Sequence, residues 1–218
     1  MFFSRFYTTS FFAIVLVQAF TLLLPQVTHS QSLRSTFPGR RVGGGTRGEC
    51  ASRLIIHLVP KSSQYSVSSD GQELIGLVQG PSAQPTGLEL TFRPLVSNGN
   101  EEQSQKKSIG YSFEPNDASV ILFSPKLNKD QSFIWESSFN CRQPGSSGEF
   151  DFITSGFPPA LSLLTTQSDE LNRGVSKTLK VWKNLCGGSI ATLDVLNKFE
   201  LSNLLSKDWP LRLPIHCP

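Results

Sequence analysis

The sequence predicts a mainly β fold, an antiparallel β-sandwich, with a C-terminal α-helical hairpin. Short apolar runs separated by turn residues follow one another from about residue 50 to residue 155. Closely spaced short strands of this kind are typical of sandwiches and barrels. After Pro158 and Pro159 the apolar residues change from a period of two to helical spacing. The chain therefore divides into a β part, residues 49–155, and a helical part, residues 156–218.

Residues 1–30 have the features of a secretory signal peptide. Arg5 gives a positive start, residues 11–24 form an apolar run, and "THS" at residues 28–30 offers small residues for cleavage. The alternative is an N-terminal membrane anchor, but the run is shorter than the roughly 20 apolar residues that a bilayer requires. We therefore expect export to the periplasm or the extracellular space.

The charge balance does not indicate a nucleic-acid partner. The chain has 20 basic and 17 acidic residues, and removal of residues 1–30 takes away Arg5 and no acidic residue. The exported chain would thus carry a net charge of +2, which is close to neutral.

Four cysteines lie beyond the predicted signal, and an even number in an exported chain predicts two disulfides with three possible pairings: Cys50, Cys141, Cys186 and Cys217. Zinc binding is disfavoured because no two of these cysteines have the C-x-x-C spacing. We expect no metal and no cofactor.

Residues 31–48 are rich in Ser, Gly, Pro and Arg, and we expect a flexible lead-in to the sandwich. The predicted strands follow, at residues 53–59, 73–79, 88–92, 109–113, 119–123, 131–141 and 149–154. The clearest is "QSFIWESSFNC", where Phe133, Trp135, Phe139 and Cys141 share one face with Ser137 between them. This alternation predicts one buried and one solvated face, with the sulfur of Cys141 pointing inward.

The sequence of the C-terminal part predicts two helices joined at Gly187 and Gly188. In the first, residues 168–188, apolar side chains recur at helical spacing and lysines gather near the end. In the second, residues 189–208, one stripe contains Ile190, Leu193, Leu196 and Leu204.

The stretch "GRRVGGGTRGEC", residues 39–50, has two candidate chemistries. The glycines resemble a phosphate-binding loop in spacing, but Glu49 and Cys50 stand where such a loop needs Lys and Ser or Thr. Arg40, Arg41 and Arg47 are possible anion-binding residues, although no aromatic residue lies among them. The alternative is that these arginines only keep the lead-in soluble.

Catalytic groups are sparse in the sequence. The segment beyond residue 30 has two histidines, of which His57 lies inside an apolar strand and His216 adjoins the C-terminal cysteine. No G-x-S-x-G nucleophile motif is present. Glu136 and Asp151 lie on or near predicted strands and are the candidates for a carboxylate pair of a polymer hydrolase. We assign no catalytic residue.

The residues "GRRVGGGTRGEC", followed by "LIIHLVP", resemble the opening of the family called domain of unknown function 928, exported proteins of cyanobacteria. "SPKLNKDQSFIWESSFNC" resembles a second element of that family, a strand with a Trp before a second cysteine. The resemblance covers about residues 39–141 and is interrupted by the polar insert near residue 100. It implies that Cys50 pairs with Cys141, which leaves Cys186 with Cys217, and it implies export and a sandwich with helices.

The residues leave enzymatic activity open and favour a non-enzymatic role. We expect a binding or accessory protein of the periplasm or cell envelope whose partner is an envelope protein or a glycan. The alternative is an envelope-polymer hydrolase that uses a carboxylate pair. Membrane contact is expected only through an uncleaved signal segment.

Overall fold

The computed structural model describes residues 37–44, 54–66, 73–81, 87–95, 109–114, 117–139, 158–166 and 170–218. The chain divides into units Met1–Thr36 and Phe37–Pro218, and all of the described residues belong to the second unit.

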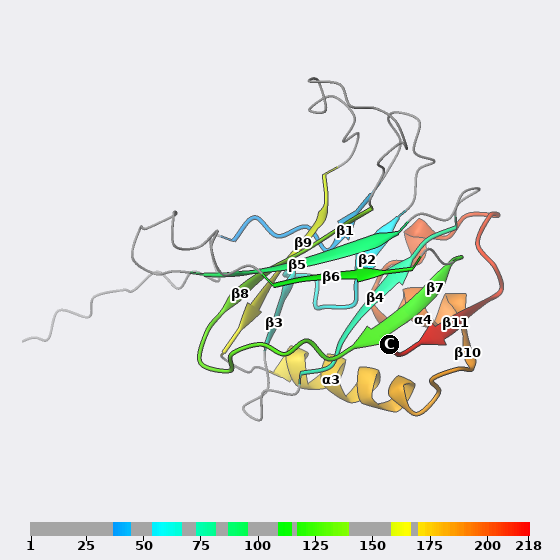
Figure 1. Cartoon of the computed structure of the whole chain (residues 1–218). Helices are drawn as coiled ribbons and strands as arrows, with labels where there is room; N and C mark the ends of the chain where they lie inside the picture. The colour runs from blue at the N-terminus through cyan, green and yellow to red at the C-terminus, as the bar shows by residue number, and fades with distance from the viewer. Residues whose placement is uncertain are drawn as a thin grey trace, which may run out of the picture. The chain divides into compact units, whose positions relative to one another are not determined.

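The described ranges contain mostly strands, with two α-helices and one short 3-10 helix (Figure 1). In chain order the elements are β1 (Val42–Gly43), β2 (Ile55–His57), β3 (Gln64–Ser66), β4 (Ile75–Gln79), β5 (Leu88–Pro94), β6 (Ile109–Phe113), β7 (Ser119–Phe123), β8 (Phe133–Phe139), β9 (Ala160–Thr165), α3 (Glu170–Lys183), β10 (Ser189–Ala191), α4 (Thr192–Lys198), η4 (Ser202–Leu204) and β11 (Arg212–His216).

The strands form two sheets. The six-stranded sheet has the order β1-β2-β4-β7-β11-β10, and the five-stranded sheet has the order β3-β9-β8-β5-β6. The predicted β-sandwich is confirmed, but the sheets are mixed, because β3 pairs with β9 and β7 pairs with β11 in parallel. Each parallel pair joins segments about 100 residues apart in the chain, a pairing that local sequence patterns cannot indicate.

The two sheets pack face to face through large side chains. In the five-stranded sheet, β5 and β8 alternate buried and partly exposed residues, as expected for a sheet with one solvated face. Phe92 of β5 contacts Trp135 of β8 and Phe123 of β7, with ring centroids 6.2 Å apart in each pair. Phe123 belongs to the opposite sheet, so this aromatic cluster joins the two layers.

The central strands of the six-stranded sheet are buried on both faces. Every residue of β4 and β7 is buried. His57, Leu77 and Ile121 are neighbours in register, and His57 faces the other sheet. On the opposite face, Leu179 of α3 packs over Gly76 so closely that a Cβ there would lie 2.9 Å from the Leu179 side chain. Helix α3 thus covers the outer face of this sheet, which explains the continuous apolar runs of its strands.

The C-terminal part is helical and also contributes strands. Helix α3 lies within the predicted first helix, but the predicted second helix is divided into β10, α4 and η4. Leu193 is 49% exposed, because α4 begins only at Thr192 and turns Val195 and Leu196 inward instead. The last strand, β11, buries Leu213 and Ile215 and completes the sheet beside β7.

Part of the expected flexible lead-in, residues 31–48, belongs to the sandwich instead. Arg40 forms a β-bridge with Leu161, and β1 pairs with β2. Gly43 packs against β9, where a Cβ would lie 2.2 Å from the backbone nitrogen of Ala160. Gly44 has a φ of 81°, a conformation that glycine adopts readily. Residues 37–44 are therefore part of the folded structure.

Candidate functional site

The outer surface of α3 carries a row of basic side chains beside a shallow hollow. The hollow has a volume of about 410 Å³ and is lined by Arg173, Ser176, Lys177, Lys180, Val181 and Asn184. All six residues belong to α3 or to the turn that follows it. The candidate site is therefore built on one rigid element.

The sequence of α3 explains why this row faces solvent. Asn172, Leu179 and Trp182 are buried, and Trp182 contacts Phe199 edge to face at 5.8 Å. The basic residues at 173, 177 and 180 are spaced by four and three, so they share the opposite face of the helix. Packing of the apolar stripe thus fixes the direction of the basic row.

The basic side chains are accessible to a ligand. Arg173 forms an ion pair with Glu170 at 3.2 Å, but the two side chains are 70% and 91% exposed. Such exposed pairs contribute only about 0–1 kcal/mol, so an anion can compete for the guanidinium. Lys177 and Lys180 are exposed, as is Lys183 one turn further along the helix. The surface is therefore electropositive over two turns.

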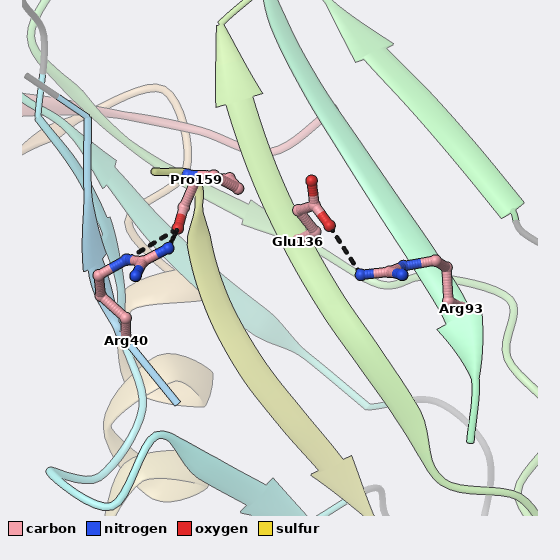
Figure 2. A network of polar contacts seen from close by, with 4 residues as sticks. All are labelled: Arg40, Arg93, Glu136 and Pro159. Atoms are coloured by element: carbon pink, nitrogen blue, oxygen red, sulfur yellow. Dashed lines mark hydrogen bonds and ion pairs between the residues drawn. The ribbon is translucent and has the colours of Figure 1, made fainter. Parts of the chain in front are cut away.

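Arg40, one of the possible anion-binding residues, binds a backbone carbonyl. Its Nε and Nη2 atoms donate to the carbonyl oxygen of Pro159 at 3.2 and 2.9 Å (Figure 2). Pro159 lies directly before β9, so this side chain reinforces the bridge between Arg40 and Leu161.

Arg41 is buried, and its side chain also binds a backbone carbonyl. Its Nη1 donates to the carbonyl of Val59 at 3.1 Å, and its backbone N–H donates to Ser63 Oγ at 3.0 Å. Burial lowers the pKa of Arg41 below its ordinary value, while the charge of Glu200 opposes that shift. Arg47 lies outside the described residues. The structure does not bring the basic row of α3 and the arginine pair into one site.

His57 occupies the interior of the sandwich. Its Nδ1 is 2.8 Å from Ser162 Oγ and its Nε2 is 2.7 Å from Ser137 Oγ. A neutral imidazole has one donor and one acceptor nitrogen, so one hydroxyl donates to the ring and the other accepts from it. The ring is fully buried, and desolvation holds the pKa of His57 well below its usual value. These contacts make His57 a cross-sheet link rather than an exposed base.

The candidate carboxylate Glu136 forms an ion pair across the five-stranded sheet. Its Oε2 is 2.9 Å from Nη2 of Arg93 on the adjacent strand β5 (Figure 2). Asp151, the other member of the possible pair, lies outside the described residues.

Cys186 and Cys217 form a disulfide, which links the turn after α3 to the end of β11. The backbone adds to this link, since the N–H of Gly187 donates to the carbonyl of Ile215 and the N–H of Ile215 donates to that of Gly188. Cys50 and Cys141 lie outside the described residues, so their pairing stays a prediction.

The described ranges contain no group of three or more His, Cys, Asp or Glu side chains placed to hold a metal ion. None of their helices combines the length and hydrophobicity that a membrane-spanning helix needs.

Comparisons with known proteins gave no relative for this chain. A scan against protein-family models, a search of curated proteins and a search of solved structures each found no match. The function of this disulfide-bonded β-sandwich is therefore inferred from its fold and its surfaces.

The basic row of α3 was missed by the sequence reasoning, although a signal was present. Lysines near the end of a helix interact favourably with the helix dipole, which by itself accounts for their position in the sequence. Their spacing with Arg173 already predicted a shared face. The shallow hollow beside that face depends on the conformations of its side chains, which the sequence does not show.

Proposed function

We propose that this chain is an exported, non-enzymatic binding protein of the periplasm or cell envelope, and that the outer surface of α3 binds an acidic glycan. The observation that carries the proposal is the alignment of Arg173, Lys177 and Lys180 along one hollow of α3. Three cations within two helical turns, about 10 Å, match successive charges on a linear polyanion.

The other residues of the hollow favour a glycan over other anions. Ser176 and Asn184 supply a hydroxyl and an amide, which form hydrogen bonds with sugar hydroxyls. Among the described residues, none of those that line the hollow is aromatic, so they offer no platform for stacking nucleic-acid bases.

Export is supported by two independent features. The disulfide between Cys186 and Cys217 is compatible with an oxidising compartment. The apolar N-terminal run and the small residues at 28–30 are those of a signal peptide. The resemblance of residues 39–50 to the exported cyanobacterial family points to the same location and adds no activity.

Titration with dextran sulfate tests this function, with uncharged dextran as the matched control probe. The protein secreted by an expression host is measured beside K177Q/K180Q and the control variant K198Q/K207Q. Lys198 and Lys207 are exposed, so both variants lose the same charge. We expect K177Q/K180Q to weaken binding at least about tenfold and the control to change it little. Equal losses in both variants, or equal binding of dextran, would contradict a site on α3.

A further inference from the structure

Strand β6 is an exposed edge of the five-stranded sheet. Among the strands that the structure describes, it pairs only with β5, from Ile109 opposite Phe92 to Phe113 opposite Leu88. Gly110 and Ser112 are exposed, and the inward residues Ile109, Tyr111 and Phe113 are only partly buried. In β5 the inward residues are buried and the outward residues are partly exposed. Each residue of β6 is therefore more exposed than the β5 residue opposite it.

The other sheet edges differ from β6. Strand β3, at the opposite edge of the same sheet, has all of its residues buried. In the six-stranded sheet, β1 has two residues and β10 has three, whereas β6 has five. Among the described strands, β6 is therefore the longest edge and the one most open to solvent.

The sequence of β6 lacks the features that usually prevent strand addition. Natural edges are protected by charged side chains, prolines or bulges. The strand "IGYSF" has no charged residue and no proline, and it pairs with β5 without a bulge. A Cβ at Gly110 would meet no atom within 4 Å. The side chains of β6 thus place no charge at this edge, and the outer face of the sheet is open at Gly110.

A hollow of about 480 Å³ adjoins the C-terminal end of β6. Phe113 and Ile121 line it from the two sheets, together with Ser112 and Glu114 beside Phe113, and residues 216–218 complete the lining. The disulfide to Cys186 holds Cys217 in place, so the wall formed by the C-terminus is fixed covalently. The edge and the hollow together present backbone hydrogen-bonding groups beside a depression with an apolar part, formed by Phe113, Ile121 and Pro218, and a polar part that includes Glu114 and His216.

We propose that β6 binds an extended segment of a partner polypeptide, which adds a strand to the five-stranded sheet and inserts an apolar side chain into this hollow. The outward N–H and C=O groups of an edge strand are matched in number and spacing by another strand. The hollow beside Phe113 supplies the specificity for an apolar residue in that segment. This surface is separate from α3 and does not depend on glycan binding.

The test uses the acetylated and amidated peptide KTFTVTK as the probe, and NMR observation of the amide groups of the purified exported chain. We expect shifts to concentrate on β6 and on residues around the hollow. A control peptide methylated on every central amide nitrogen keeps the side chains but cannot form the strand, and we expect it to bind at least about tenfold more weakly.

Two matched variants locate the binding edge. Ser112 and Ser138 both lie opposite Glu89, on either side of β5, so each serine-to-lysine change meets the same neighbour. We expect S112K to weaken peptide binding and S138K, on β8 two strands in from the edge, to leave it unchanged. Absence of binding, equal binding of the methylated peptide, or shifts away from β6 would overturn the proposal. Dimerisation of the free protein that S112K abolishes would also overturn it, in favour of a second copy as the occupant.

Discussion

His57 and Trp135 stack on each other across the interior of the sandwich, with ring centroids 3.5 Å apart and planes 8° from parallel. His57 belongs to the six-stranded sheet and Trp135 to the five-stranded sheet. Ser137 and Ser162 lie on the five-stranded sheet, and their hydroxyls form hydrogen bonds with the two nitrogens of the imidazole. A polar group with satisfied hydrogen bonds thus fixes how the two sheets face each other.

The burial of His57 predicts that stability depends on pH. Its pKa is lowered in the folded state, while the unfolded chain has a value near 6.5. The unfolded state therefore binds the proton more tightly. Stability is complete above about pH 6.5 and declines as the pH falls below that value, by up to about 1.4 kcal/mol per pH unit until the folded pKa is reached. Urea unfolding between pH 8 and pH 5 measures this slope.

Two variants assign that slope to its residue. We expect H57Q to be less stable at pH 8 and to lose most of the slope between pH 6.5 and pH 5. The exposed His216 is the control, and H216Q is expected to retain the slope of the unmodified protein. A slope that survives in H57Q would contradict the role given to His57.

Two glycine-to-alanine changes are expected to have opposite effects. At Gly43 the new Cβ would overlap the backbone of β9, so G43A should lower the free energy of unfolding by about 1–3 kcal/mol or more. At Gly174 in α3 a Cβ would meet nothing within 4 Å, so G174A should raise it by about 0.5–1 kcal/mol. Thermal unfolding of both proteins checks the signs, and a neutral G43A would show that β1 does not pack on β9.

The disulfide between Cys186 and Cys217 should contribute substantially to stability. The two residues are 31 positions apart, and closing a loop of that length restricts the unfolded chain by about 3–4 kcal/mol. We expect C186S/C217S to lose about that amount in urea unfolding. Peptide mapping without reductant should recover the Cys186–Cys217 pair, and a peptide joining either residue to Cys50 or Cys141 would contradict the pairing.

We expect substitution of Arg41 to lower the stability of the fold and to leave anion binding unchanged. R41M removes the hydrogen bond to the carbonyl of Val59 and leaves that group without its charged donor, a cost of about 1–3 kcal/mol. R40M, at an exposed residue, should cost less. Affinity for dextran sulfate should remain unchanged in R41M. A stable R41M with weakened anion binding would support the anion-binding role of the arginine pair instead.

The sequence predicted elements whose signals are local. The alternation along β8 correctly placed Phe133 and Trp135 inward, and helical spacing correctly indicated α3. The role of Ser137 was not predictable, because its partner His57 lies 80 residues away. Leu213 and Ile215 did alternate before the C-terminus, but a five-residue strand is stable only beside β7, which the sequence does not show.

The site was less predictable than the fold for a related reason. An arginine in a Gly-rich segment has the same sequence pattern whether its guanidinium meets water or a carbonyl. The acceptors of Arg40 and Arg41 are backbone groups of Pro159 and Val59, and backbone carbonyls are present at every residue. The distinction depends on tertiary contacts and becomes visible only in the folded structure.

The salt dependence of dextran sulfate binding tests the proposed function most directly. If Arg173, Lys177 and Lys180 neutralise three charges of a flexible polyanion, log K should fall against log salt concentration with a slope of about −2, or about −0.7 for each group, as for single strands of nucleic acid. K177Q/K180Q should reduce the slope to about −0.7. A slope near zero, or the same slope in this variant as in the unmodified protein, would contradict a glycan site on α3.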